Sequence, residues 1–74
     1  MDARTIRELV EYCVSNQVPI NRYKINSYSY GVKTYDSPND IPEQELNLAP
    51  LLVGTRGYKD ECGLRCRELE IFCY

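Results

Sequence analysis

The sequence predicts a small α+β domain, in which an N-terminal helix packs on a three- to four-stranded, mostly antiparallel sheet. This prediction depends on a helical repeat of apolar residues near the N-terminus and on strand-like alternation in the middle and at the C-terminal end. The length of 74 residues fits one domain over 1–74. A chain of this length buries only about 60% of the surface that it exposes when unfolded. It therefore has little room for an enclosed substrate pocket.

The helix is predicted over about residues 5–16. Thr5 and Glu8 have the spacing of a capping box, in which each satisfies the backbone N–H of the other. Behind them, apolar residues recur at the i, i+3 and i+4 positions of one helix face: Ile6, Leu9, Val10, Cys13 and Val14. Pro19 prevents the helix from continuing.

A strand hairpin is predicted over about residues 22–35. Tyrosine and isoleucine are frequent in this stretch, and it contains no good helix-forming run. We expect two strands, over about 22–28 and 32–35, joined by a turn around Tyr30 and Gly31. Tyr28 and Tyr30 are two positions apart, so we expect them to share one strand face.

An acidic loop and a short helix are predicted over 36–48. Asp40 is the expected N-cap of this helix, with Pro42 in its first turn. The segment 48–53 is the most apolar in the chain and is expected to be buried as a strand or an extended segment. The stretch 54–63 is rich in turn residues.

The last element is predicted as a strand over about residues 66–73. Alternation places three of its apolar residues on the inward face: Leu69, Ile71 and Cys73. A helix over 60–69 is the alternative for the first part of this segment.

The four cysteines raise the possibility of a zinc site or of disulfides. Cys62, Cys66 and Cys73 lie within the last 13 residues, but the chain has no histidine and no Cys-x2-Cys pair. We therefore predict no metal and no cofactor, with these three as the weak candidates for metal ligands. Cys13 and Cys73 are expected to be small buried hydrophobic residues. A cysteine- or zinc-stabilised structural subunit remains an alternative.

Catalytic motifs are weak throughout the chain. Without histidine, a cysteine nucleophile has no neutral-pH base beside it. No glycine-rich phosphate loop is present, and the paired carboxylates lie in polar segments that do not separate their pKa values. These features favour a protein without enzymatic activity.

The strongest functional signal lies in residues 22–35, which combine tyrosines with bases and contain no acid. Tyrosine and arginine dominate protein–protein interfaces, because they supply large contact areas with polar ends. The predicted contact residues are Arg22, Tyr23, Lys24, Tyr28, Tyr30, Lys33 and Tyr35, with Arg56 and Tyr58 presented by the next predicted turn.

These observations favour a small protein-binding module that acts as an inhibitor or regulator of a larger protein or complex bearing an acidic patch. Phage-encoded inhibitors of host machinery, such as RNA polymerase or a defence nuclease, share this general size and composition. The alternative is a nucleic-acid-binding module in which segment 22–35 stacks bases on its tyrosines. Self-association stays open.

The sequence favours a cytoplasmic protein without membrane contact. No run approaches the roughly 20 apolar residues that span a bilayer. The charged first residues are not followed by the apolar stretch of a secretory signal.

Overall fold

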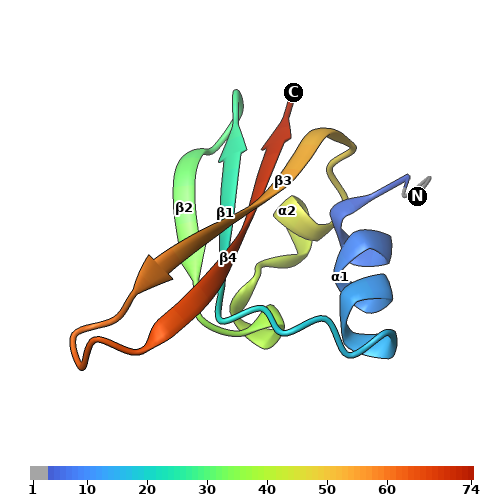
Figure 1. Cartoon of the computed structure of the whole chain (residues 1–74). Coiled ribbons are helices and arrows are strands. Elements are labelled where there is room, and N and C mark those ends of the chain that lie inside the picture. The colour runs from blue at the N-terminus through green and yellow to red at the C-terminus, as the bar shows by residue number, and fades with distance from the viewer. Residues whose placement is uncertain (1–3) are drawn as a thin grey trace.

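In residues 4–74, four strands form one sheet, and two α-helices lie against one of its faces (Figure 1). The computed structural model describes residues 4–74. In chain order the elements are α1 (Ile6–Ser15), β1 (Arg22–Ser27), β2 (Gly31–Tyr35), the 3-10 helix η1 (Pro38–Asp40), α2 (Glu43–Leu46), β3 (Pro50–Lys59) and β4 (Arg65–Cys73). This architecture confirms the predicted α+β class. No helix in the part of the chain that the structure describes is long and apolar enough to cross a membrane.

The sheet has the strand order β2-β1-β4-β3 and is mixed. The hairpin pairs β1–β2 and β3–β4 are antiparallel, whereas the central pair β1–β4 is parallel. The prediction of a mostly antiparallel sheet was therefore wrong at its centre. Sequence reasoning finds hairpins because they are local, but the way two hairpins join depends on residues far apart in the chain.

The core lies between α1 and the middle of the sheet. Half of the predicted capping box forms, since the Thr5 hydroxyl accepts a hydrogen bond of 3.3 Å from the Glu8 amide. The Glu8 carboxylate accepts from the amide of Arg4 at 3.1 Å, and not from that of Thr5 as predicted. The buried apolar residues are Ile6, Leu9, Val10 and Cys13 of α1, Tyr23 and Ile25 of β1, Ile41, and Leu69, Ile71 and Cys73 of β4. The inward face predicted for the last strand is confirmed, whereas Val14 is exposed and does not join the core.

The predicted β1–β2 hairpin is confirmed, but Tyr28 and Tyr30 lie in its turn and not on a strand face. The Ser27 hydroxyl accepts a hydrogen bond of 2.9 Å from the Tyr30 amide. Gly31 has φ +78°, a left-handed value that glycine adopts without strain, and it begins β2.

The short acidic helix begins later than predicted. Asp40 ends η1, and the N-cap of α2 is Pro42, which makes no side-chain capping bond. Ile41 precedes a proline and is extended, and its side chain is buried in the core. Because Ile41 is fixed in this way, a helix cannot start at Asp40.

The chain from residue 50 onward differs most from expectation. β3 includes much of the stretch predicted as turns, and only residues 60–64 connect it to β4. The alternative helix over 60–69 is absent, since β4 begins at Arg65. The apolar segment 48–53 is extended as predicted, but Leu51, Leu52 and Val53 are exposed. The core residues on the sheet belong to β1 and β4, so β3 lies at an edge beyond the core.

Candidate functional site

The predicted contact residues do not form one surface, and Tyr23 is not on the surface at all. Its side chain is only 4% exposed and packs in the core beside Ile25. The prediction that Tyr23 contacts a partner was therefore wrong. In β1, alternate residues point inward, and Tyr23 lies in that inward series.

Tyr35 is partly buried and has a structural partner. Its hydroxyl donates a hydrogen bond to Oε1 of Glu45, a fully buried carboxylate of α2. Burial of the phenol, together with this bond to Glu45, raises the pKa of Tyr35 to about 12. The Tyr35 hydroxyl is thus already engaged within the fold.

Arg22 is likewise engaged within the fold. Its Nε donates to Oε2 of Glu68, whose side chain is almost completely buried. Its guanidinium lies over the Tyr58 ring, 4.0 Å from the ring centroid. The hydrogen bond to Glu68 raises the pKa of Arg22 above its ordinary value. Because Glu68 neutralises it, Arg22 adds little to the attraction of an acidic partner.

The sheet face opposite α1 brings together four of the predicted residues. Pairing in register places Arg22 and Lys24 of β1 on the same face as Arg56 and Tyr58 of β3. Arg56 forms an ion pair of 3.7 Å with Glu70, which lies between them on β4. Lys33 is exposed beside Ile25 in register, and therefore projects on the other side of the sheet.

We call the sheet face opposite α1 the open face. One row of side chains on it is mostly apolar, and none of the predicted contact residues lies in this row. Val32, Asn26, Phe72 and Leu52 are successive partners across all four strands. Except for Asn26, these side chains are exposed. The alternation of β4 did place Phe72 opposite the core residues, which was the available signal. Nothing in the sequence indicated that Leu52 is exposed, because it lies in an apolar run and such runs are usually buried.

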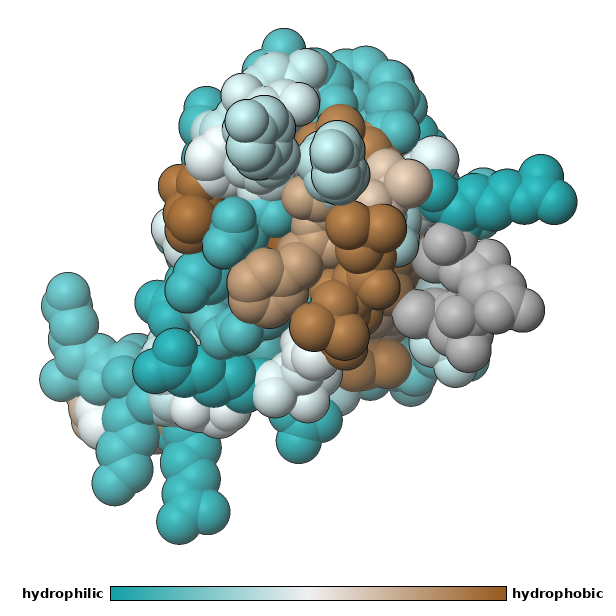
Figure 2. Space-filling view, turned by 90° about the horizontal axis from the view of Figure 1, so that it is seen from above, coloured by the Kyte–Doolittle hydropathy of each residue, from teal (hydrophilic) through white to brown (hydrophobic). Residues whose placement is uncertain are grey.

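The tyrosines at the ends of β1 and β4 extend this row. Tyr28 is 89% exposed, and its ring stacks on that of Tyr74 with centroids 6.2 Å apart. We call this region the apolar end, and it consists of Tyr28, Val32, Leu51, Leu52, Phe72 and Tyr74. Figure 2 views the molecule from above and shows hydrophobic atoms gathered at the surface between hydrophilic ones.

The apolar end adjoins a free strand edge. β3 is one of the two edge strands of the sheet, and no other strand of residues 4–74 pairs with its outer side. All residues from Leu51 to Gly57 are exposed, with Leu51 at 67% and Leu52 at 65%. Such an edge presents unpaired N–H and C=O groups that can bond to a further strand. β3 thus offers both backbone groups and apolar side chains.

The cysteines do not converge. Cys13 and Cys73 are buried as predicted, and burial raises the pKa of both thiols. Cys66 lies beside Tyr58 on the open face, whereas Cys73 faces the core, so these two point to opposite sides of β4. All four thiols are free, and residues 4–74 contain no cluster of three or more His, Cys, Asp or Glu side chains that could hold a metal ion.

The chain matches no protein-family model, no curated protein and no solved structure. The candidate site therefore depends on the geometry of this molecule alone.

Proposed function

We propose that this protein is a non-catalytic binding module that regulates or inhibits a larger protein, which it contacts through the apolar end and the adjoining edge of β3. The observation that supports this proposal most is the exposed apolar row that crosses all four strands and ends on Leu52. The involvement of a phage and a host machine stays a prediction.

Exposed apolar side chains at this density favour a docking surface. Single exposed apolar residues are common, but contiguous patches on a small monomer mark interaction sites. Burying a leucine or phenylalanine side chain stabilises a complex by about 1.5–3 kcal/mol. Phe72, Leu52 and the stacked pair of Tyr28 and Tyr74 supply the large side chains on which interfaces depend.

The free edge of β3 supplies a second mode of attachment. An extended segment of the partner can add to this edge through backbone hydrogen bonds, and side-chain contacts then determine which segments fit. β3 is ten residues long, which exceeds the usual strand length of about five or six. An edge of this length gives an added segment several backbone bonds.

The nucleic-acid alternative loses support from the placement of segment 22–35. Arg22 is paired with Glu68 and Tyr23 is in the core. The remaining bases, Lys24 and Lys33, point to opposite sides of the sheet. No stripe of cations interleaved with accessible rings remains on this segment.

The proposal is tested by capture of the partner on immobilised protein from a native lysate of the source cells, with and without nuclease. The captured protein is then purified and its Kd is measured against two double variants. Leu52→Ser with Phe72→Ser removes two exposed apolar side chains from the apolar end. Tyr12→Ser with Val14→Ser makes a matched change on the outer face of α1, where both residues are also exposed.

We expect the apolar-end variant to bind at least about tenfold more weakly, which corresponds to about 1.4 kcal/mol. The α1 variant should bind like the unmodified protein, and both should keep the native circular dichroism spectrum. Equal affinities of the two variants would contradict the proposal. Loss of the captured material on nuclease treatment would indicate nucleic-acid binding instead.

A further inference from the structure

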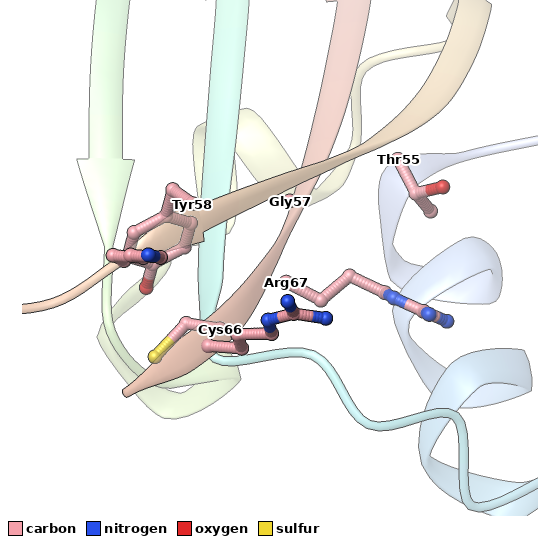
Figure 3. A pocket seen from close by; sticks show the side chains of 7 residues that line it. Thr55, Gly57, Tyr58, Cys66 and Arg67 are labelled. Atoms are coloured by element: carbon pink, nitrogen blue, oxygen red, sulfur yellow. The ribbon is translucent and has the colours of Figure 1, made fainter. Parts of the chain in front are cut away.

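A basic pocket opens on the β3–β4 hairpin, away from the apolar end (Figure 3). It has a volume of about 480 Å³ and is lined by Thr55, Gly57, Tyr58, Lys59, Arg65, Cys66 and Arg67. In Figure 3, Arg67 reaches from β4 toward α1, whereas Tyr58 and Cys66 lie on the other side of the hairpin. Three of the lining side chains are cations and none is a carboxylate.

These cations have no acidic partner within residues 4–74. The ion pairs there join Arg7 to Glu43, Arg22 to Glu68 and Arg56 to Glu70. Asp60, the acid next to Lys59 in sequence, directs its Oδ1 to the amides of Cys62 and Leu64, each at 2.9 Å. The positive charge of the pocket is therefore not neutralised by a contact within the fold.

The pairing of the hairpin brings like charges together. Lys59 and Arg65 are direct cross-strand partners, and Arg67 follows Arg65 on the same face of β4. Like charges directly opposite each other destabilise an antiparallel pair. An anion bound between these side chains would remove that repulsion.

The pocket is also held in place by the fold. Asn21 fixes the backbone of Arg67 twice, because its N–H donates to the Arg67 carbonyl at 2.8 Å and its Oδ1 accepts from the Arg67 amide at 2.9 Å. Gly57, opposite Arg67 in register, has no side chain to fill the space. The backbone of Arg67 is thus fixed by contacts within the fold.

We infer that this pocket binds an acidic segment of the protein partner, an inference that depends on the proposed function. Arginine forms paired hydrogen bonds with carboxylates, which suits Arg65 and Arg67 to aspartate or glutamate side chains. β3 joins the apolar end at Leu52 to the pocket at Lys59. At about 3.3 Å per residue, these positions are roughly 23 Å apart. Leu52 projects on the face opposite α1 and Lys59 on the α1 side, so a strand added along the edge of β3 would contact both with side chains from its two faces.

The surroundings favour an acidic protein segment over a nucleic acid. A second hollow shares Lys59 with the pocket, and its lining contains three carboxylates, Asp36, Asp60 and Glu61, against two cations, Lys59 and the Glu68-paired Arg22. These carboxylates would repel a phosphate backbone that continued past the pocket. A protein segment with a few acidic residues at one end meets the cations and avoids these acids.

The test uses labelled oligoglutamate as the probe, with single-stranded oligo-dT of equal charge as the nucleic-acid comparison. Binding is followed by fluorescence polarisation and by the amide NMR signals of the protein. Arg65→Glu with Arg67→Glu reverses the charge of two of the three pocket cations. Lys24→Glu with Lys33→Glu is the control, since it changes the net charge by the same amount elsewhere on the sheet.

We expect oligoglutamate to shift the amide signals of residues 55–59 and 65–67. The pocket variant should weaken its binding at least about tenfold, and the control variant less than about twofold. We also expect Arg65→Glu alone to raise Tm by a few degrees, because it places opposite charges across the hairpin. This rise would show that a glutamate at position 65 does not unfold the protein.

Three results would overturn the inference: no shift with oligoglutamate, equal weakening by both variants, or tighter binding of oligo-dT. Binding of the captured partner to the two variants distinguishes a failure of this inference from a failure of the proposed function. If the apolar-end variant loses the partner while the pocket variant keeps it, the inference fails and the proposed function stands. If both variants keep the partner, the proposed function fails as well.

Discussion

Two glutamates are buried in this small protein, and each is bonded to a residue that the sequence suggested for partner contact. Tyr35 donates to Glu45, and Arg22 donates to Glu68. The other carboxylate oxygen of each glutamate has no hydrogen-bond partner among the described residues. A buried polar group that loses its remaining partner destabilises a fold by about 1–3 kcal/mol. Tyr35 and Arg22 are therefore needed for stability.

Tyr35→Phe tests this role directly. We expect the substitution to lower the free energy of unfolding at pH 7 by about 1–3 kcal/mol, because it leaves the Glu45 carboxylate without a donor. Urea unfolding measures the change. Tyr30→Phe is the matched control, because Tyr30 lies in an exposed turn and should change stability by less than about 0.5 kcal/mol.

The same pair predicts a pH dependence. The pKa of Tyr35 is raised to about 12 in the folded protein, whereas tyrosine in an unfolded chain has a pKa of about 10. The unfolded chain therefore loses this proton first as pH rises. The stabilisation is complete below pH 10 and decreases as the pH approaches 12. Between pH 7 and pH 11, the free energy of unfolding should decrease less for Tyr35→Phe than for the unmodified protein. Equal decreases would contradict the role of the Tyr35 hydroxyl.

At the scale of elements, one carboxylate organises the connection between β3 and β4. Asp60 Oδ1 accepts hydrogen bonds from Cys62 and Leu64, and the Asp60 amide donates to the Leu64 carbonyl at 3.0 Å. Gly63 closes the turn with φ +78°. The basic pocket lies directly beyond this connection, so its geometry depends on Asp60.

We expect Asp60→Ala to destabilise the protein by about 1–2 kcal/mol, because two backbone amides lose their acceptor. Asp60→Asn is the control, since its side-chain oxygen can still accept both bonds. Thermal unfolding compares the variants. Equal losses for alanine and asparagine would show that the charge of Asp60 matters and the hydrogen bonds do not.

The elements also show what the sequence could predict. α1 and β4 follow from local periodicity, and the inward face of β4 was correct at Leu69, Ile71 and Cys73. The parallel pairing of β1 with β4 and the exposure of β3 were missed, because both depend on contacts between distant residues.

The candidate site was predicted only in part. Arg22, Lys24, Arg56 and Tyr58 do lie on one face of the sheet, although a turn was expected to present the last two. Tyrosine content alone could not separate Tyr23, which is buried by strand alternation, from Tyr28, which is exposed in a turn.

At the scale of the molecule, the fold is asymmetric. α1 and α2 cover the centre of the sheet, whereas the β3–β4 hairpin projects beyond them (Figure 1). The principal extents of 33 × 26 × 21 Å describe this elongated shape. Among the described residues, β3 is attached to the rest of the sheet only through β4.

Native-state hydrogen exchange should follow this asymmetry. We expect the amides of β1 and β4 that bond within the sheet to exchange at rates close to those of global unfolding. The amides of β3 should exchange at least about tenfold faster, because this strand opens without disturbing the core. Ile25 and Ile71 report on the centre, and Val53 and Thr55 report on the edge. Uniform protection across the four strands would contradict this expectation.

The parallel pairing of β1 with β4 has a consequence for the order of folding. Arg22 contacts Glu68, 46 positions further along the chain, so the centre of the sheet closes a long loop. In the part of the chain that the structure describes, β3 has no neighbour in the sheet except β4. During synthesis, neither the centre nor the free edge can assemble until residues 65–73 have emerged. The edge proposed to bind the partner is therefore completed only after β4, and a chain without β4 does not yet display it.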